Sequence, residues 1–427
     1  MDSLLIKGAY VVDPSQNIEG RKDVLIENGK IIKIENTIPE SQATRIIHAD
    51  NLVLTPGFID IHTHLRDPGY EWKEDIETGS LCAVAGGITS LCCMANTDPV
   101  NDNPSVTRYI IEKAKKVNLC DVFPVGALTK GLKGEEIAEI GQMVEAGIVA
   151  VSDDGEVPRN SKLLRNAFDY AKSFGIPVLC HSEDKTLSAG GHMNEGYLST
   201  ILGIPGIPPE AEDIGTLRDI MIAKMTGAKI HICHVSTEGA LEIIKKAKKE
   251  GVKVTCEITP HHFSLTEDAV KTFDTNAKMA PPLRTERDVK ACKKALSEGI
   301  ADVVATDHAP HSKDEKMVEF NNAPYGIIGF PTLLPLSLNL VREGILSLSQ
   351  MVEKLTVNPA KIINKKDIGS LKPGNRANIT IFDSEEEFTL TEEMILSKSK
   401  NTPFLNQKLK GRVKLTIRNG KIVYNNL

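Results

Sequence analysis

The chain has 427 residues, which is enough for an α/β barrel of about 250 residues beside a smaller domain. Its net charge of -6 and pI near 6.0 provide no basic field for nucleic acid or for an anionic membrane surface. Because the eight cysteines form no Cys-x-x-Cys pair and neither a basic leader nor a membrane-length apolar stretch is seen, we expect a cytoplasmic protein without a zinc–thiolate site.

The two ends of the chain share one pattern. Residues 4–55 hold short β-prone runs around a turn at Asn28-Gly29, and residues 378–424 repeat the pattern around Asn419-Gly420. An Asn-Gly pair between β-prone runs is the strongest short signal for a hairpin. We therefore expect one small β-sandwich-like domain assembled from residues 1–55 and 365–427.

Between these ends, residues 56–364 alternate β-prone and helical segments. The β-prone runs are mostly apolar throughout, which is typical of strands buried on both faces. The segment 239–250 is charged and periodic, so its apolar positions would cover such strands while its lysines face water. Eight strands with intervening helices predict a (β/α)8 TIM-type barrel. The expected strands are residues 57–61, 88–95, 121–128, 147–151, 176–180, 228–232, 252–258 and 301–305.

Five of the expected strands end in residue types that bind divalent metals. In a parallel barrel the carboxyl ends of all strands meet at one face, so these side chains can converge on one point. The pattern predicts a metal-dependent enzyme whose active site lies at that face. The five strand ends are Asp60-Ile-His-Thr-His64, Ser152-Asp-Asp-Gly155, Cys180-His-Ser-Glu183, His231-Ile-Cys-His234 and Ala305-Thr-Asp-His-Ala-Pro-His311.

The histidines in these strand ends are candidate metal ligands. His62 and His64 lie two residues apart on a strand, so both side chains point to the same face, which in a barrel is the interior. Two histidines satisfied by backbone groups are a poor alternative because barrel interiors prefer branched apolar residues. A single histidine such as His181 or His234 is usually structural, but here the two occur together at neighbouring strand ends.

Carboxylates complete the candidate cluster. Asp307 closes the eighth strand, where a carboxylate can both hold a metal and transfer a proton. Either Asp153 or Asp154, after the fourth strand, would bridge two cations, and periodicity leaves open which one turns inward. The other is expected to cap the loop. Two histidine pairs and two carboxylates are enough ligands for two metal ions about 3.5–4 Å apart.

At this point the residues resemble a known family. Residues 60–69 and 305–316 are similar to the two signature segments of the dihydroorotases, which are cyclic amidohydrolases, and the intermediate segment Pro281-Pro-Leu-Arg284 agrees. The resemblance extends over essentially the whole chain and is greatest to the class I, bacterial or archaeal branch. It implies an enzyme of pyrimidine biosynthesis that interconverts N-carbamoyl-L-aspartate and L-dihydroorotate.

The resemblance also implies a cofactor, two zinc ions per subunit. Many members of the superfamily bridge their ions with a carboxylated lysine at the end of the fourth strand, and this chain has no lysine there. By the resemblance, one ion would be held by His62, His64 and Asp307 and the other by His181 and His234, with Asp154 as the bridge.

For the substrate, the resemblance implies that Arg66, Asn96 and His311 bind the carboxylate and that backbone at Tyr325 and Gly326 contacts the ring. Arg66 also makes independent sense because a guanidinium group binds a carboxylate through two hydrogen bonds.

The chain departs from the family at another substrate-binding position, Ala280. The family usually has an asparagine there, directly before Pro-Pro-Leu-Arg, and that asparagine contacts the substrate. We therefore expect one substrate hydrogen bond to differ in this chain.

Two alternatives stay open. A hydantoinase, dihydropyrimidinase or allantoinase would share the barrel and the metals, but its ring substrate lacks the carboxylate that Arg66 would bind. A non-catalytic dihydroorotase-like subunit that supports aspartate transcarbamoylase would typically have lost metal ligands, all of which are present here. We expect a small-molecule substrate and a homodimer, keep association with aspartate transcarbamoylase open, and expect neither nucleic acid nor membrane as a partner.

Overall fold

Eight short parallel strands close into a barrel in the computed structural model, which describes residues 3–427. The strands follow one another in chain order, and a bridge between Thr63 and His308 joins the first strand to the segment after the last. All eight strands expected from the sequence are present. They are β6 (Phe58–Thr63), β7 (Ile88–Cys93), β8 (Asp121–Ala127), β9 (Ala150–Ser152), β10 (Val178–Cys180), β13 (Ile230–Ile232), β14 (Val254–Ile258) and β15 (Val303–Val304).

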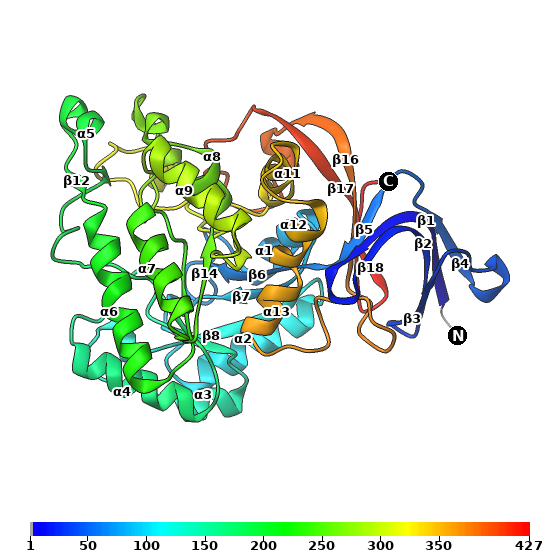
Figure 1. Ribbon diagram of the computed structural model, residues 1–427, viewed down its shortest axis with the longest axis horizontal. Helices are drawn as coiled ribbons and strands as arrows, with labels where there is room; N and C mark the ends of the chain where they lie inside the picture. Colours follow the sequence, from blue (N-terminus) through cyan, green and yellow to red (C-terminus); the bar gives the residue numbers. More distant parts are fainter. Residues whose placement is uncertain (1–2) are drawn as a thin grey trace.

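Helices surround this barrel, as Figure 1 shows. In α7 (Glu238–Lys249), the side chain of Thr237 accepts a hydrogen bond from Ala240 N and thereby caps the first turn. The apolar positions Leu241 and Ile244 are buried, and lysines occupy the outer face, as the periodicity predicts. The other covering helices are α1 (Ile76–Ala85), α2 (Pro104–Val117), α3 (Ile140–Ala146), α4 (Ser161–Ser173), α6 (Glu210–Thr226), α9 (Glu286–Ser297), α11 (Leu333–Arg342), α12 (Leu348–Leu355) and α13 (Val357–Ile362).

Shorter elements lie in the connections of the barrel and of the terminal strands. Among residues 3–427, no helix combines the length and the apolar composition needed to span a bilayer. The short elements are α5 (Tyr197–Leu202), α8 (Pro260–Ser264), α10 (Lys313–Lys316), β11 (Met193–Asn194), β12 (Gly206–Ile207) and the 3-10 turns η1 (Pro14–Gln16), η2 (Glu40–Gln42), η3 (Lys130–Leu132), η4 (Glu267–Val270), η5 (Thr275–Ala277) and η6 (Glu392–Met394).

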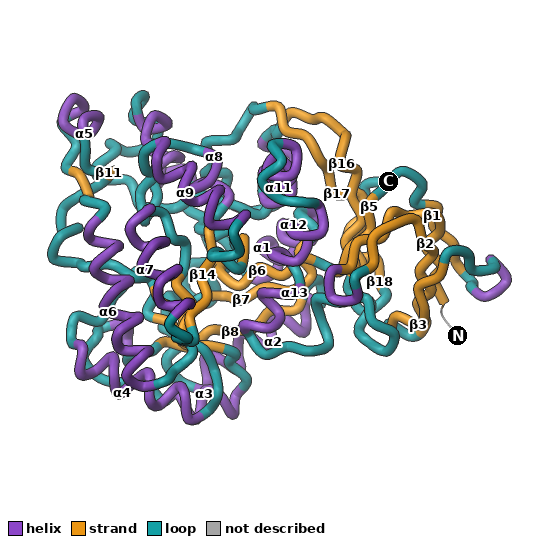
Figure 2. Tube along the Cα trace, in the orientation of Figure 1, coloured by secondary structure: helices purple, strands orange, loops and turns teal. Residues whose placement is uncertain are grey.

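Strands from both ends of the chain form a second sheet beside the barrel, which Figure 2 shows as the strand-rich end of the molecule. Its strand order is β18-β17-β16-β5-β1-β2-β3, with β4 paired to β1. This is the terminal β-structure expected from the sequence, whereas the exact domain boundaries stay a prediction. The strands are β1 (Ser3–Asp13), β2 (Ile18–Glu27), β3 (Lys30–Glu35), β4 (Arg45–His48), β5 (Val53–Pro56), β16 (Ile379–Thr389), β17 (Lys408–Arg418) and β18 (Lys421–Asn425).

The two Asn-Gly pairs form the tight hairpin turns that the sequence indicates. Asn28 and Gly29 have φ angles of 49° and 78°, and Asn419 and Gly420 have 49° and 75°, the left-handed region that two-residue hairpin turns of this type require. The turns also touch each other, because a Cβ atom on Gly29 would lie 2.7 Å from Asn419 O. Glycine is therefore needed at position 29 for space as well as for conformation.

Candidate active site

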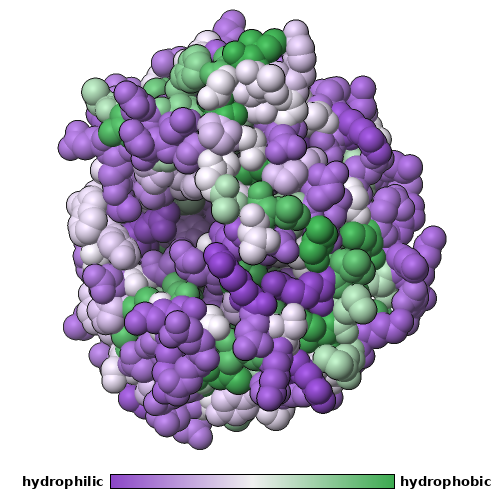
Figure 3. All heavy atoms as spheres, turned by 90° about the vertical axis from the view of Figure 1, so that its left-hand side faces the viewer, coloured by the Kyte–Doolittle hydropathy of each residue, from purple (hydrophilic) through white to green (hydrophobic). Residues whose placement is uncertain are grey.

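The carboxyl ends of the barrel strands surround a cavity of about 650 Å³. Figure 3 views the molecule from this side and shows a hollow with a hydrophilic lining. All six residues expected as metal ligands are buried here. Along the chain they are His62 at the end of β6 and His64 after it, Asp154 after β9, His181 after β10, His234 after β13 and Asp307 after β15.

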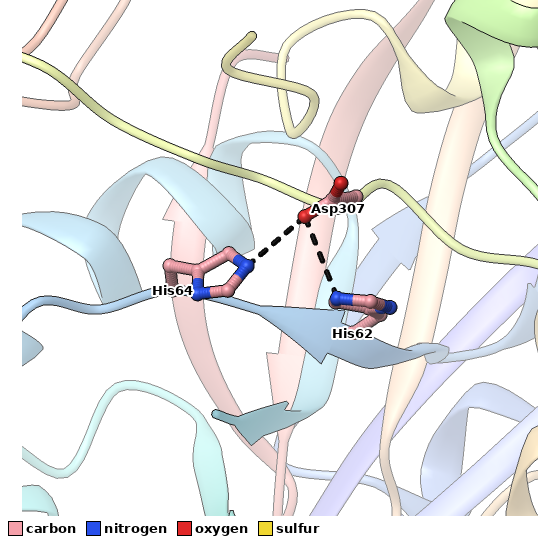
Figure 4. Close-up of side chains that lie close together, drawn as sticks. All are labelled: His62, His64 and Asp307. Atoms are coloured by element: carbon pink, nitrogen blue, oxygen red, sulfur yellow. Dashed lines mark hydrogen bonds and ion pairs between the residues drawn. The ribbon is translucent and has the colours of Figure 1, made fainter. Parts of the chain in front are cut away.

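His62, His64 and Asp307 form one group (Figure 4). Asp307 Oδ1 lies 3.0 Å from His64 Nε2 and 3.5 Å from His62 Nε2. One donor atom from each residue lies within 4.8 Å of the others, a spacing that one metal ion can span. The structure therefore brings together the three residues expected to hold the first ion.

Asp154 lies between this group and the other two histidines. Its Oδ1 is 3.4 Å from His62 Nε2 and 3.4 Å from His181 Nδ1. The same oxygen is 3.5 Å from His234 Nε2, and Oδ2 is 3.3 Å from His64 Nε2. A carboxylate that contacts all four imidazoles is in the position of a bridging ligand.

His181 and His234 form the second group. His181 Nδ1 lies 2.9 Å from His234 Nε2, and the two rings meet edge to face. The other ring nitrogen of His181, Nε2, lies 3.3 Å from Glu183 Oε2, and Lys185 Nζ lies 2.7 Å from that same oxygen. These contacts turn Nδ1 of His181 and Nε2 of His234 toward Asp154.

The two carboxylates of the cluster are ionised and favour binding of a cation. Burial would raise the pKa of Asp154 and Asp307, but the neighbouring histidines outweigh burial and hold the pKa of both carboxyl groups below the usual value. Burial opposes protonation of His181, yet Asp154 and Glu183 raise its pKa to about 9. Two buried candidate ligand atoms, His62 Nε2 and Asp154 Oδ1, have no hydrogen-bond partner among the described residues. Buried polar atoms of this kind need a partner, and a divalent metal fits this set of nitrogen and oxygen donors.

Glu257, at the inner side of β14, is a site residue that the sequence reasoning missed. Its Oε1 accepts a hydrogen bond from His62 Nδ1 at 2.6 Å and one from His234 N at 3.2 Å. Its Oε2 lies 3.0 Å from His231 Nε2. Because Nδ1 of His62 faces this carboxylate, Nε2 is the nitrogen left to bind a metal ion. The only sequence signal was a glutamate inside an apolar strand, which must find a partner when buried.

The open choice between the two aspartates after β9 is decided by their contacts. Asp154 faces the cluster, whereas Asp153 Oδ1 accepts hydrogen bonds from Leu128 N at 2.8 Å and Thr129 N at 2.9 Å. Asp153 Oδ2 accepts a further one from Thr129 Oγ1. Asp153 is thus the loop-capping residue of the pair.

Three candidate residues have left-handed backbone conformations. The φ angles are 62° at Arg66, 36° at His234 and 46° at Asp307. Non-glycine residues rarely adopt this region, and each instance costs about 1–3 kcal/mol that the surrounding structure must offset. The backbone at these positions is therefore held in place by the fold, which aims the side chains into the cavity.

Arg66 and His311 lie together on the cavity wall. Arg66 Nε donates to Pro310 O at 3.2 Å, and Arg66 Nη2 lies 3.3 Å from His311 Nε2. Burial and the nearby arginine lower the pKa of His311, so this imidazole is neutral and accepts the hydrogen bond at Nε2. Asn96 Oδ1 accepts from His64 Nδ1 at 2.9 Å, so the amide nitrogen is the atom that would donate to a substrate.

The remaining expected substrate residues also line the cavity. Tyr325, Gly326 and Ala280 form part of its wall. The backbone of Gly326 is already engaged, because its N donates to Lys278 O at 2.9 Å and its O accepts from Asn401 Nδ2 at 3.0 Å. Ala280 is half-buried and lines the cavity.

Two buried lysines hold the loop between α10 and Gly326, which borders the cavity. Lys278 Nζ donates to Phe320 O at 2.8 Å and to Asn321 O at 3.0 Å. Lys316 Nζ donates to Pro324 O at 2.8 Å and to Thr275 O at 2.9 Å. No carboxylate lies within ion-pair distance of either amine in the described chain. Sequence reasoning missed both residues because a lysine in a polar loop normally faces water.

Comparison with known proteins identifies relatives over the whole chain. Residues 53–423 match the model of the amidohydrolase family. The chain is 53% identical over 422 residues to a dihydroorotase of Geobacter metallireducens and 52% identical over 422 residues to one of Trichlorobacter lovleyi, and each alignment covers 99% of both chains.

Among solved structures, the chain is similar to an L-hydantoinase (dihydropyrimidinase) from Arthrobacter aurescens. The TM-score is 0.90 at 25% sequence identity, covering 100% of this chain and 97% of that one. The barrel and terminal sheet are therefore an arrangement that dihydroorotases and hydantoinases share.

Proposed function

Since this chain belongs to the amidohydrolase family and, within it, to the dihydroorotases, we propose that the cluster at the barrel mouth carries the chemistry of that reaction. The reaction is the reversible cyclisation of N-carbamoyl-L-aspartate to L-dihydroorotate and water, a step of pyrimidine biosynthesis. The observation that carries the proposal is the position of Arg66, a half-buried cation on the wall of the same cavity as the candidate metal ligands. Dihydroorotate has a carboxylate for this cation, whereas hydantoin has none.

The candidate ligands would hold two zinc ions. His62, His64 and Asp307 supply one set of donors, and His181 and His234 supply another. Asp154, which contacts all four histidines, would be shared between the ions. Imidazole nitrogen and carboxylate oxygen are ordinary zinc ligands. A metal bound there acts as a Lewis acid that lowers the pKa of a water molecule and polarises the carbonyl group that is attacked.

Asp307 is the proposed proton carrier. Both of its contacts with histidine use Oδ1, so Oδ2 is the atom that would exchange a proton. In ring opening, this carboxylate accepts the proton of the attacking water and delivers it to the ring nitrogen as the C–N bond breaks. In ring closure the same group takes the proton of the attacking amide nitrogen and gives it to the departing water.

The wall beside the cluster would orient the substrate. Arg66 would bind the carboxylate through two charge-assisted hydrogen bonds, and neutral His311 keeps the guanidinium group in place. Asn96 would donate its amide N–H to the same carboxylate. Because both backbone groups of Gly326 are engaged, Tyr325 is the more available of the two backbone positions for the ring.

Replacement of Arg66 tests the proposal against a hydantoinase. We expect Arg66→Met to raise the KM for dihydroorotate about 10- to 160-fold, because charge-assisted hydrogen bonds contribute about 1.5–3 kcal/mol. Metal content should not change, since Arg66 contacts none of the proposed ligands. Arg159→Met, which removes another cation from the rim of the same cavity, is the control. An unchanged KM in Arg66→Met would contradict carboxylate recognition by this residue.

The alternative of a non-catalytic subunit has little support, because such subunits typically lack metal ligands and all six side chains are brought together here. Metal analysis combined with a hydrolysis assay distinguishes the two. Association with a second copy and with aspartate transcarbamoylase are further predictions from the resemblance, as is the cytoplasmic location.

A further inference from the structure

Glu257 uses both of its carboxylate oxygens, and only one of them faces the candidate metal ligands. Oε1 lies 2.6 Å from His62 Nδ1 and accepts a hydrogen bond from His234 N at 3.2 Å. Oε2 lies 3.0 Å from His231 Nε2. The side chains of Glu257, His62 and His231 are all fully buried. His231 is therefore the residue that holds the oxygen of Glu257 that the ligands leave free.

His231 is in turn held by Thr255. The two residues are paired in register on the neighbouring strands β13 and β14. Thr255 Oγ1 lies 2.8 Å from His231 Nδ1 and 3.4 Å from Ile230 O, so the ring is its nearer partner. An ionised carboxylate can only accept, so His231 donates to Glu257 from Nε2, and the hydroxyl group of Thr255 can serve Nδ1 as donor or as acceptor. With one partner on each ring nitrogen, the orientation of the His231 ring is fixed.

These contacts form a continuous chain through the barrel. Thr255 is half-buried and lines a groove of about 310 Å³, which is bordered by residues at the starts of β10, β13 and β14. The candidate metal ligands lie at the other side, where the strands end. From the groove to the ligands the chain runs through Thr255, His231, Glu257 and His62. Three hydrogen bonds thus connect a residue at the amino-terminal side of the barrel with a candidate ligand.

Stability alone gives no reason for this chain. A buried histidine paired with a buried carboxylate is usually no more stable than two apolar side chains of similar volume, because both polar groups must leave water. Barrel interiors are accordingly filled mostly by branched apolar residues. The polar chain ends at His62, and a fixed carboxylate beside a metal-binding histidine sets the orientation of its ring. Orientation of a ligand is therefore the role that these contacts support.

We propose that His231 and Thr255 are positioning residues of the candidate metal site. His231 holds Glu257 in the rotamer that brings Oε1 to His62, and Thr255 keeps the ring of His231 turned toward Glu257. Neither residue contacts any of the six candidate ligands through its side chain, so their effect on zinc would pass through Glu257. The inference rests on the proposed metal chemistry and adds two residues to it.

The first experiment measures zinc affinity by competition with a chelator of known affinity. Thr255→Val removes the hydroxyl group but keeps the shape, and should lower the affinity about 2- to 12-fold, the range of one neutral hydrogen bond. Thr255→Ser keeps the hydroxyl group and should bind zinc as wild type does. Thr89→Val is the matched control, because Thr89 also lies on a barrel strand but its hydroxyl group donates to Phe58 O. A Thr255→Val variant that binds zinc as tightly as Thr89→Val would overturn the proposal.

Substitution of His231 tests the middle of the chain. His231→Leu leaves Oε2 of Glu257 without its partner, and we expect the zinc affinity to fall at least about 10-fold, as for other groups that support a ligand. His231→Gln places an amide N–H within reach of the same oxygen and should recover part of the loss. Equal zinc affinities in wild type and His231→Leu would contradict the role. If His231→Leu does not fold, the Thr255 variants decide.

A double variant separates positioning from a general loss of stability. If Thr255 acts through Glu257, Thr255→Val should lower the zinc affinity no further in a protein that already carries Glu257→Gln. The same additional loss in that protein would overturn the proposal, because it would show an effect independent of Glu257. At saturating zinc the KM of Thr255→Val for dihydroorotate should equal that of wild type, since Arg66 and Asn96 are unchanged. A wild-type chain that binds no zinc would contradict the proposed function as well, whereas unchanged affinities in the variants contradict this inference alone.

Discussion

At the scale of single residues, neighbouring side chains fix the candidate histidine ligands. Each contact uses the ring nitrogen that faces away from the cluster. His62 is fixed by Glu257, His64 by Asn96 and His181 by Glu183, each through the ring nitrogen that does not face Asp154. Such partners select the tautomer and the ring orientation of metal-binding histidines. The pattern of histidines and aspartates was visible in the sequence because ligand spacing follows strand geometry. The supporting glutamate and the left-handed backbone at Asp307 depend on contacts between distant strands, so no local pattern indicates them.

Replacing Glu257 should weaken metal binding without removing a ligand. We expect Glu257→Gln to lower the affinity for zinc about 10- to 100-fold, the usual effect of losing such a supporting group. Competition with a chelator of known affinity measures it. Asp121→Asn is a matched control, because Asp121 is also a buried carboxylate of a barrel strand but pairs with Arg376 and Arg418. Equal losses in both variants would show that Glu257 has no specific role.

Ala280 offers a second test at this scale. By the resemblance, a substrate group that meets an asparagine in the family would here be met by water, at a cost of about 0.5–1.5 kcal/mol for a neutral hydrogen bond. Because Ala280 is half-buried on the cavity wall, we expect Ala280→Asn to lower the KM for dihydroorotate about 2- to 12-fold. Steady-state kinetics in both directions check this. A raised KM would mean that the asparagine collides with a group that already fills the space.

At the scale of secondary structure, the apolar runs and the Asn-Gly turns were sufficient to predict every barrel strand and both terminal hairpins. Each signal is local, because a buried parallel strand must be apolar along its length and a tight hairpin needs left-handed residues. The loop after α10 is different. Its attachment depends on Lys278 and Lys316, whose amines bind carbonyl groups contributed by a distant segment. No sequence signal distinguishes these lysines from lysines that face water.

The buried Lys316 at the end of α10 predicts a pH dependence of stability. Burial, assisted by Lys278 and Arg66 and opposed by Asp274 and Glu315, lowers the pKa of Lys316 from 10.5 to about 7. Between these values the unfolded chain binds a proton that the folded chain does not, so this residue makes the unfolding free energy rise with pH.

We therefore expect the stability of wild type relative to Lys316→Met to increase between pH 7 and about 10, by on the order of 2 kcal/mol. Denaturant unfolding at several pH values measures this difference. Lys313→Met, which removes an exposed lysine of the same short helix, should leave the pH dependence as in wild type. Parallel curves for wild type and Lys316→Met would contradict the assignment.

At the scale of the whole molecule, the fold alone does not select the reaction. The barrel and the terminal sheet match a hydantoinase with a TM-score of 0.90, while the relatives at 53% identity are dihydroorotases. A shared fold hosts different substrates by changing the residues around the site. In this chain the distinction lies in the cation Arg66, which follows the first barrel strand and lies beside the candidate metal cluster. The sequence already indicated this arginine. Both enzyme types would need the metal cluster itself.

The most direct test of this account is the ratio of kcat/KM for ring opening of L-dihydroorotate and of hydantoin by the zinc-loaded protein under identical conditions. We expect dihydroorotate to be preferred at least about 10-fold, the smallest factor that one charge-assisted contact with Arg66 would provide. A protein that carries its metal yet opens hydantoin as fast as dihydroorotate, or does not open dihydroorotate at all, would contradict the account.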